Sequence, residues 1–335
     1  MMTLRRLSPL LLLVPLAAAN LLWGSTALPA GEILDALTGN APPDSMAAFI
    51  LTEVRLPRLL TALLAGAALS AAGLVMQTVF ANPLADPSIL GVNSGASLGA
   101  ALALLLLGGG ITAGGIALSG FLLTVCAAFI GATAVIGLLV LCSSLLRGSL
   151  PLLIAGIMIS FAASAVISLL SFYATAQGVR SYVMWGMGDF SGVSAGRVPL
   201  FAGPVCMGLV LLCLMAKPLN ALLLGNDYAA NLGFRIRRVR TTLLLLTGLL
   251  TALVTALCGP IAFLGLAMPH VTRLLLGTAD HRRLLPAAIL WGADAALLCN
   301  LISLLPGERG QLPVNALTSL LGIPFIFFIL LRERN

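Results

Sequence analysis

The sequence contains very little charge. Only 9% of its 335 residues are Asp, Glu, Lys or Arg, and 60% are hydrophobic, whereas soluble domains have about 25% and about 45–50%. A soluble fold of this composition would leave much apolar surface in water. A bilayer removes that cost because lipid covers apolar side chains, and each spanning helix needs about 20 residues. We therefore predict an all-α polytopic membrane protein with about ten transmembrane helices, forming one domain over 1–335.

Residues that most catalytic and cofactor chemistry needs are also scarce. Lys217 is the single lysine and precedes Pro218, so the chain has no P-loop, which requires Gly-Lys-Ser/Thr. The six cysteines lie in apolar runs without metal-ligand spacing, and we expect them to be small buried hydrophobes. A G-x-S-x-G match at 95–99 lies in a predicted membrane helix, not on the strand-to-helix turn of a hydrolase. We expect no enzymatic activity and no cofactor bound by this chain.

The formal net charge is +7, but the basic residues do not form a face interleaved with aromatic residues. This argues against nucleic-acid binding. Within the predicted spans Asp294 is the one clear acid, and a proton relay normally needs several such groups. An ion-coupled secondary transporter stays open as an alternative, although its inverted repeats are not evident. An intramembrane enzyme is a further alternative, and it would need a catalytic pair of residues at the same depth in the membrane.

Apolar runs broken by glycine, proline and charge define the expected spans. They are placed at 7–28, 56–80, 88–108, 114–142, 151–172, 199–216, 240–258, 262–276, 284–304 and 312–331. The eighth span is short, so we expect it to be tilted, broken or only partly spanning.

Small residues recur at four-residue spacing in several spans. The clearest case is Gly91, Gly95 and Gly99, and Gly66 with Ser70 is a weaker one. Helices in lipid associate through close van der Waals contact, which such stripes permit. The pattern predicts a tightly packed bundle.

The basic residues are distributed unevenly between alternate loops. With the first helix retained, thirteen of the 18 lysines and arginines fall on one side and five on the other. The positive-inside rule then places both termini in the cytoplasm. The alternative is a cleaved signal peptide, because Arg5 and Arg6 precede leucines and the run 17–19 is alanine.

Four segments are more polar or constrained than a simple bundle requires: 55–58, 82–87, 225–234 and 259–273. The arginines of the first could bind lipid phosphate or an acidic partner, where rim charges steer association. The second reads as a stiff turn that stops two helices. The third is either a solvated loop with a basic anchor or a short helix that docks in a groove of a cytoplasmic partner. The fourth suggests a broken helix near a pathway, with His270 in a structural role.

In this order the segments resemble the permease family of bacterial ABC importers (FecCD type) for ferric siderophores, haem and cobalamin. The resemblance covers nearly the whole chain. It is carried by R-L-P-R at 55–58, N-P-L-A-D-P at 82–87, G-P-I-A-F-L-G-L-A-M-P-H at 259–270, D-H-R-R-L-L-P at 280–286, L-P-V at 312–314 and G-I-P-F at 322–325.

The resemblance implies a type II ABC importer permease bundle in the bacterial inner membrane. It implies a second permease copy, forming a homodimer around one pathway, with two cytoplasmic ATPase subunits that hold ATP and Mg²⁺. A periplasmic substrate-binding protein would deliver the cargo, and membrane lipid would surround the spans. Alternating access would then move the chelate inward, and haem is only one candidate cargo.

The resemblance also implies roles for individual residues. Binding-protein docking would fall on Arg55, Arg58 and Arg309, of which Arg309 would replace a family arginine that has an apolar counterpart here. The cytoplasmic gate would be Asn82, Leu84 and Ser149. ATPase coupling, in the loop of about 220–240, would involve Asp227, Ala229, Ala230, Leu232 and Gly233. The pathway, including a short outer helix of about 178–190, would be lined by Ser171, Thr175, Gln177, Tyr182, Met184 and Trp185. The acid that the family usually has in the ninth span appears here as Asn300.

Overall fold

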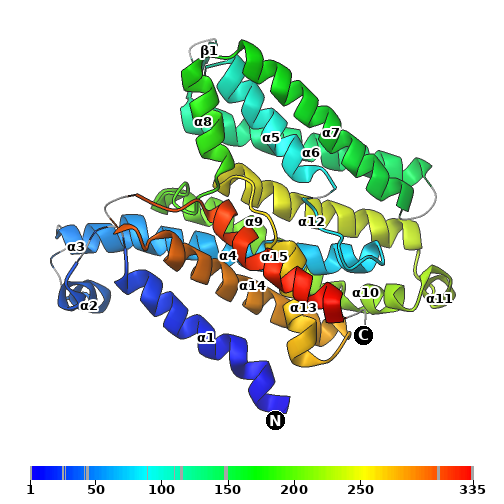
Figure 1. The fold of residues 1–335 in the computed structure, drawn as a ribbon. Coiled ribbons are helices and arrows are strands. Elements are labelled where there is room, and N and C mark those ends of the chain that lie inside the picture. The colour runs from blue at the N-terminus through cyan, green and yellow to red at the C-terminus, as the bar shows by residue number, and fades with distance from the viewer. Residues whose placement is uncertain are drawn as a thin grey trace.

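The computed structural model describes residues 2–24, 26, 28–40, 42, 45–88, 90–108, 110–113, 116–146, 150–307 and 310–332. The described chain is a bundle of helices with one small β-hairpin (Figure 1). The longer helices are α1 (Met2–Leu22), α4 (Leu56–Val79), α6 (Gly120–Leu145), α7 (Leu150–Tyr173), α9 (Val198–Leu214), α12 (Ile236–Cys258), α13 (Leu264–Leu276), α14 (His281–Ser303) and α15 (Val314–Arg332). The shorter elements are α2 (Ala30–Thr38), α3 (Met46–Phe49), η1 (Ile50–Arg55), α5 (Val92–Ala101), η2 (Leu102–Leu106), β1 (Gly110–Ala113), β2 (Ile116–Ser119), α8 (Ala176–Gly186), η3 (Ala195–Arg197), α10 (Ala216–Leu223) and α11 (Asn226–Asn231).

Helix α4 forms the centre of the bundle. It packs against α14, α12, α13 and α9, and nearly all of its side chains from Pro57 to Val79 are buried. Its buried hydroxyls find partners nearby: Thr61 donates to the carbonyl of Pro57, and Ser70 donates to the carbonyl of Ala288 on α14. A helix that is apolar all round and surrounded by other helices is typical of a membrane protein core.

Glycines let the α4 backbone touch its neighbours directly. A Cβ atom at Gly66 would overlap the carbonyl oxygen of Gly292 on α14, and one at Gly73 would overlap that of Gly265 on α13. The predicted stripe on α5 works in the same way, because a Cβ at Gly95 would overlap the backbone of α6. Both predicted small-residue stripes are therefore confirmed as close helix contacts.

Helices α5 to α8 form a second group beside the main bundle, in cyan and green in Figure 1. Within it α5 packs on α6 and α7, and α8 packs on η2. The group joins the rest chiefly through α12, which contacts both α6 and α4. Helix α7 leaves most of its apolar surface uncovered in the single chain, as expected for a face that meets lipid or another chain.

Within the described residues, six helices are long and apolar enough to cross a bilayer, and four shorter apolar helices lie at 9–22, 92–106, 264–276 and 314–324. Each of these helices overlaps one of the expected spans. The eighth predicted span is α13, with 13 residues and hence a length of about 20 Å. It is shorter than the hydrocarbon core of about 30 Å, so the expectation of a short span is confirmed.

Three details differ from the sequence predictions. The fourth expected span corresponds to α6, which begins at Gly120 and not at 114, because the antiparallel hairpin of β1 and β2 precedes it. The glycine run 108–110 interrupts the apolar pattern at the start of this hairpin. The short outer helix ends at Gly186, before Gly188 with its positive φ of 72°. Only Cys258 and Cys299 of the six cysteines are buried, because apolar positions on a span can also face outward to lipid.

The close contact at Gly66 predicts a large effect of a very small substitution. Gly66→Ala places a methyl group against the backbone of α14, and overpacking of this kind costs about 1–3 kcal/mol of stability. The matched control is Gly203→Ala on α9, where nothing lies within 4 Å of the added carbon. Thermal unfolding in detergent should show a lower Tm for the first variant only; equal Tm values would contradict the contact.

Candidate functional site

Polar side chains gather at both ends of α4, and Ser70 is the one polar side chain between Thr61 and Gln77. Arg58 lies near one end and Thr78 near the other, and their separation of twenty residues along the helix corresponds to about 30 Å. That distance matches the hydrocarbon thickness of a bilayer. We call the two groups the Arg58 network and the His281 network after their central side chains.

Arg55 lies at the same end of α4 as Arg58, and its side chain binds backbone carbonyls of this chain. Its Nη1 donates to the carbonyls of Leu21 and Leu22 at 2.6 and 2.9 Å, and its Nη2 donates to that of Thr26 at 2.8 Å. The carbonyls of Leu21 and Leu22 end α1, where the last turn of a helix has no partners of its own. A guanidinium there also complements the negative end of the helix dipole.

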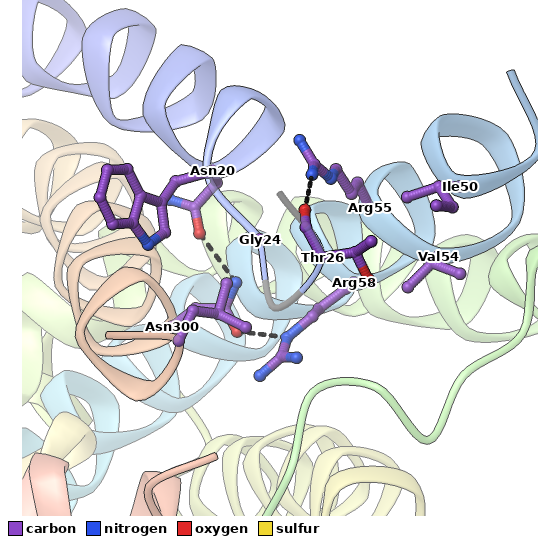
Figure 2. Close-up of a pocket in the computed structure, with 10 residues that line it drawn as sticks. Asn20, Gly24, Thr26, Ile50, Val54, Arg55, Arg58 and Asn300 are labelled. Carbon is purple, nitrogen blue, oxygen red and sulfur yellow. Dashed lines mark hydrogen bonds between the residues drawn. The ribbon is translucent and has the colours of Figure 1, made fainter. Parts of the chain in front are cut away.

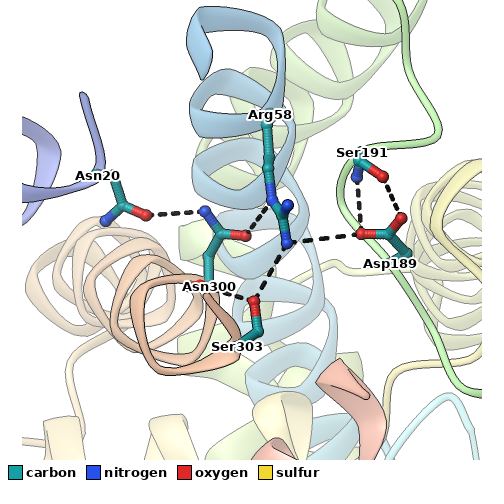
Figure 3. A network of polar contacts seen from close by, with 6 residues as sticks. All are labelled: Asn20, Arg58, Asp189, Ser191, Asn300 and Ser303. Atoms are coloured by element: carbon teal, nitrogen blue, oxygen red, sulfur yellow. Dashed lines mark hydrogen bonds and ion pairs between the residues drawn. The ribbon is translucent and has the colours of Figure 1, made fainter. Parts of the chain in front are cut away.

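The Arg58 network consists of Asn20, Arg58, Asp189, Asn300 and Ser303 (Figure 3). Arg58 Nε donates to Asn300 Oδ1 at 2.7 Å, and Nη2 donates to Ser303 Oγ at 3.1 Å. Asn300 Nδ2 donates in turn to Asn20 Oδ1 at 2.8 Å. The guanidinium forms an ion pair with Asp189 at 3.7 Å. The network thus joins α1, α4, α14 and the segment after α8 around one buried cation.

A small pocket opens beside both arginines (Figure 2). Its volume is about 70 Å³ and its lining residues are Asn20, Trp23, Gly24, Thr26, Ile50, Val54, Arg55, Arg58, Asn300 and Leu304. The only charged side chains in this lining are the two arginines. Since about 10–15 Å³ holds one water, the pocket has room for a carboxylate group and the positive charge to attract one.

Three loops meet next to this network, at residues 187–189, 258–262 and 314–315, which we call the three-loop junction. Asp189 N donates to the carbonyl of Cys258 at 2.8 Å, and Asn315 N donates to that of Met187 at 3.0 Å. Asn315 Oδ1 accepts from Ala262 N at 3.1 Å. The junction therefore ties the end of α8 to the end of α12 and the beginning of α15.

The three predicted docking arginines have different outcomes. Arg55 and Arg58 do lie together at one end of the bundle, as predicted, but both residues are buried and line a pocket instead of projecting outward. Arg309 lies outside the described residues. A docking function for these residues stays a prediction, and it now requires that a partner's group reaches into the pocket.

The His281 network forms the opposite end. Thr78 Oγ1 lies 2.8 Å from His281 Nε2, and His281 N donates to Asn220 Oδ1 at 2.8 Å. Asn220 Nδ2 donates to Asp280 Oδ1 at 2.6 Å, and Asp280 caps α14 by accepting from Arg282 N. The Asn220 hydrogen bond, together with that from Arg282, lowers the pKa of Asp280 below its usual value. The network fixes α10 to α4 and α14.

The predicted gate loop lies beside this network. His270 Nε2 lies 2.8 Å from the carbonyl oxygen of Pro83, which supports the structural role expected for this histidine. Asn82 Oδ1 accepts from Leu84 N at 2.9 Å, so the expected stiff turn is present. Leu84 is 42% exposed, whereas Ser149, the third predicted gate residue, lies outside the described residues.

The predicted coupling segment forms helix α11 and the turn after it. Gly225 precedes the helix with a φ of 103° and Gly233 follows it with a φ of 86°; both values favour glycine. Ala229 is fully buried, whereas Tyr228 and Leu232 are 51% and 55% exposed. Asp227, Ala230 and Gly233 are also exposed. Of the two alternatives for this segment, the structure has the short helix, which ends at Asn231, and its apolar outer face is uncovered.

The predicted pathway residues lie on or next to α8. Thr175 caps the helix by accepting from Gly178 N at 3.1 Å, and Tyr182 stacks on Trp185. Gln177 and Met184 are exposed, whereas Ser171 on α7 is partly buried and donates to its own helix. Helix α8 packs on η2 and α5, and the role of these positions in transport stays a prediction.

The structure gives no support to the rival catalytic reading. The match at 95–99 lies within α5, a continuous helix, so Ser97 has no nucleophile turn. Its neighbour is Tyr182. Burial raises the pKa of Tyr182 above its usual value, and a hydrogen bond with Ser97 partly offsets this rise. Within the described residues, no group of three or more His, Cys, Asp or Glu side chains is arranged to hold a metal ion.

Comparison with known proteins decides the family. The model of the FecCD transport family matches residues 10–332. The chain belongs to the FecCD transport family. It is 36% identical over 326 residues to the vitamin B12 import system permease protein BtuC of Klebsiella pneumoniae, covering 97% of this chain and 92% of that protein. BtuC of Citrobacter koseri is also 36% identical, over 289 residues that cover 84% and 83% of the two chains.

Solved structures agree with this assignment. A transporter described as being of the metal-chelate ABC type, in an inward-facing conformation, has a TM-score of 0.84 and 30% identity and covers 98% of each chain. PsaBC from Streptococcus pneumoniae, in complex with Fab, has a TM-score of 0.57 at 17% identity, covering 90% of this chain and 95% of that one, and shares the fold alone. The chain is therefore a multi-pass permease subunit of an ABC transporter of the FecCD type.

For this FecCD permease, sequence reasoning missed the partners of Arg58. The resemblance singles out Asn300 only as the replacement of an acid, and Asp189 falls within the expected outer helix of about 178–190 without a role of its own. Asn20 is 3% exposed in an otherwise apolar span. A buried polar residue in such a span usually has a polar partner, and this signal could have directed attention to α1.

Removing Asn300 should destabilise the permease. Asn300→Ala deprives Arg58 Nε of its acceptor and Asn20 of its donor, and a buried polar group left unpaired costs about 1–3 kcal/mol. Asn300→Asp keeps an acceptor for Arg58 and should lose less. Tm measurements in detergent test this order, and an alanine variant at least as stable as the aspartate variant would refute it.

The cap of α14 predicts a pH-dependent difference. Asp280→Ala should lose about 0.5–2 kcal/mol at neutral pH, as N-cap removal typically does. Because the folded-state pKa of Asp280 is lowered, its contribution is present above the usual pKa of about 3.9 and is lost as the pH falls through the folded value.

The Tm gap between wild type and Asp280→Ala should therefore narrow on acidification from pH 7 towards pH 3. Glu53→Ala, at an exposed position of η1, is the control and should show little difference at either pH. A gap that widened at low pH would contradict the assigned cap.

Proposed function

We propose that this permease imports a metal chelate of the cobalamin, ferric siderophore or haem class across a bacterial inner membrane. Two copies of the chain form one pathway, two cytoplasmic ATPase subunits drive it, and a periplasmic binding protein delivers the cargo. The observation that carries the proposal is the match over nearly the whole chain, at 36% identity, to permeases named for vitamin B12 import. Both termini lie in the cytoplasm, as the arginine distribution favours.

The positively charged pocket supports docking of a binding protein. Arg55 and Arg58 supply the only charged side chains in a lining of ten residues, so the pocket favours an acidic side chain from outside. The cavity of about 70 Å³ fits the end of a Glu or Asp, not a folded surface. Docking of this kind places one carboxylate in each pocket and thereby fixes the register of the binding protein.

Helix α11 supports coupling to an ATPase. Its exposed Tyr228 and Leu232 offer two apolar anchors, as expected for a helix that enters a groove of a partner. Helix α10, directly before it, is fixed to α4 and α14 by Asn220. A displacement of α11 by the ATPase would therefore reach the centre of the bundle through α10.

Cobalamin is the first substrate to test, because the relatives named above are vitamin B12 permeases. The tagged permease is purified from its native host, and the copurifying ATPase and binding protein are identified by mass spectrometry. Proteoliposomes of that complex should take up labelled cyanocobalamin, ferric siderophore or haem with ATP, and vanadate should abolish uptake. Uptake driven by an ion gradient without an ATPase would support the secondary-transporter alternative instead.

Replacing residues 227–233 by a Gly/Ser linker of equal length should abolish ATP-driven uptake. The replacement removes both apolar anchors of α11, whereas the network at Asn220 lies outside it and should keep the bundle assembled. Equal expression and Tm are the controls, and the single variants Tyr228→Ser and Leu232→Ser should each have intermediate uptake. Normal uptake by the linker variant would remove the coupling role.

A further inference from the structure

The ion pair of Arg58 with Asp189 suggests more than a structural bond. Arg58 lines the docking pocket and at the same time contacts Asp189, whose carboxylate lies across the guanidinium from Asn300 (Figure 3). Its other two partners, Asn300 and Ser303, are neutral. Asp189 is thus the one internal carboxylate paired with this cation among the described residues. It occupies the chemical role that an acidic side chain entering the pocket would take.

The geometry of the Arg58–Asp189 ion pair favours replacement of Asp189 by another carboxylate. Its separation of 3.7 Å is longer than the 2.7–2.9 Å of a strong charge-assisted hydrogen bond. The side chain of Asp189 is 49% exposed, whereas that of Arg58 is 6% exposed, so water can solvate the acid once it is released. Pairs with one exposed member contribute little, and a second carboxylate at closer range would compete effectively for Arg58.

Release of Asp189 would act on the three-loop junction. The carboxylate accepts from Ser191 N at 3.0 Å and also binds Ser191 Oγ, while its own backbone N donates to Cys258. The preceding residues bind the beginning of α15 through Val314 and Asn315. A change at this one side chain therefore reaches the C-terminal end of α8 and the first turn of α15 together.

We propose that Asp189 is an internal competitor for the docking carboxylate. In the undocked transporter it holds Arg58 and keeps the three-loop junction closed. When an acidic side chain of the binding protein enters the pocket it takes over Arg58, and the freed Asp189 loosens the junction and so allows α8 to move. Asp189 is a positioning residue that links docking to the outer end of the pathway. This inference rests on the docking proposed above.

The test uses the purified complex in nanodiscs with its copurified binding protein, and measures the docking Kd. Asp189→Asn keeps the turn with Ser191, because asparagine forms the same turn, and removes the competing charge. Its docking Kd should fall roughly two- to five-fold, the range of a partly exposed ion pair, while Asp189→Glu should stay near wild type. Glu53→Gln, which removes an exposed acid from η1, controls for long-range charge.

A second background separates direct competition from general electrostatics. In an Arg58→Gln chain, Asp189→Asn should no longer change the docking Kd, whereas Glu53→Gln should have the same effect with or without Arg58. An unchanged or higher Kd for Asp189→Asn, or an equal fall in both backgrounds, would overturn the inference and leave the proposed function intact. Failure of the wild-type complex to bind the protein at all would overturn both.

Hydrogen exchange gives a readout that does not depend on Arg58→Gln folding. Docking should increase amide exchange of wild-type peptides covering 187–191 and 313–315, whose backbone bonds form the junction. Undocked Asp189→Asn should already exchange faster there than wild type, with peptides of α6 unchanged as the internal control. Slower or equal exchange in these peptides on docking would overturn the proposed release.

Discussion

The close approach of the α4 backbone to α14 and α13 is the constraint on which the rest of the structure depends. Lipid offers no hydrophobic force to drive helices together, so contact has to come from packing. Gly66 against Gly292 and Gly73 against Gly265 provide it without intervening side chains. With α4 fixed in this way, its two ends can each hold a polar network at a set distance, and the remaining helices pack around an element that is almost fully buried.

Burial of two arginines follows from this arrangement. A charge removed from water is costly unless it is paired or fully hydrogen-bonded. Arg55 meets the condition with backbone carbonyls at the end of α1, and Arg58 meets it with side chains from α14 and the segment after α8. The two arginines therefore differ in the kind of partner that compensates their buried charge. The hydrogen bonds of Arg55 go to backbone carbonyls, whereas Arg58 has one partner, Asp189, whose side chain is half exposed.

Much of the fold could be predicted because hydropathy and glycine spacing are direct consequences of the bilayer. The coupling segment could also be predicted, since Gly225 and Gly233 bracket a short polar helix. The interior of the Arg58 network could not. Its members come from positions 20, 58, 189, 300 and 303, and no local pattern reports that Asn20 lies against Asn300. Sequence motifs identified the arginines but assigned them to the surface, because two charges at a span end normally face water.

The two polar networks give α4 the character of a rigid connection between opposite faces. Arg58 and Thr78 are on the same helix and about 30 Å apart, and α14 repeats the pairing with Asn300 and His281. Neither helix has a glycine with positive φ between these points, and α4 has no proline there, whereas α14 contains Pro286. Movement at one face is therefore poorly absorbed inside α4. It has to be taken up where the chain is broken, at the three-loop junction and at the gate loop. Backbone hydrogen bonds connect the elements at the three-loop junction, and the side chain of His270 holds the gate loop at Pro83.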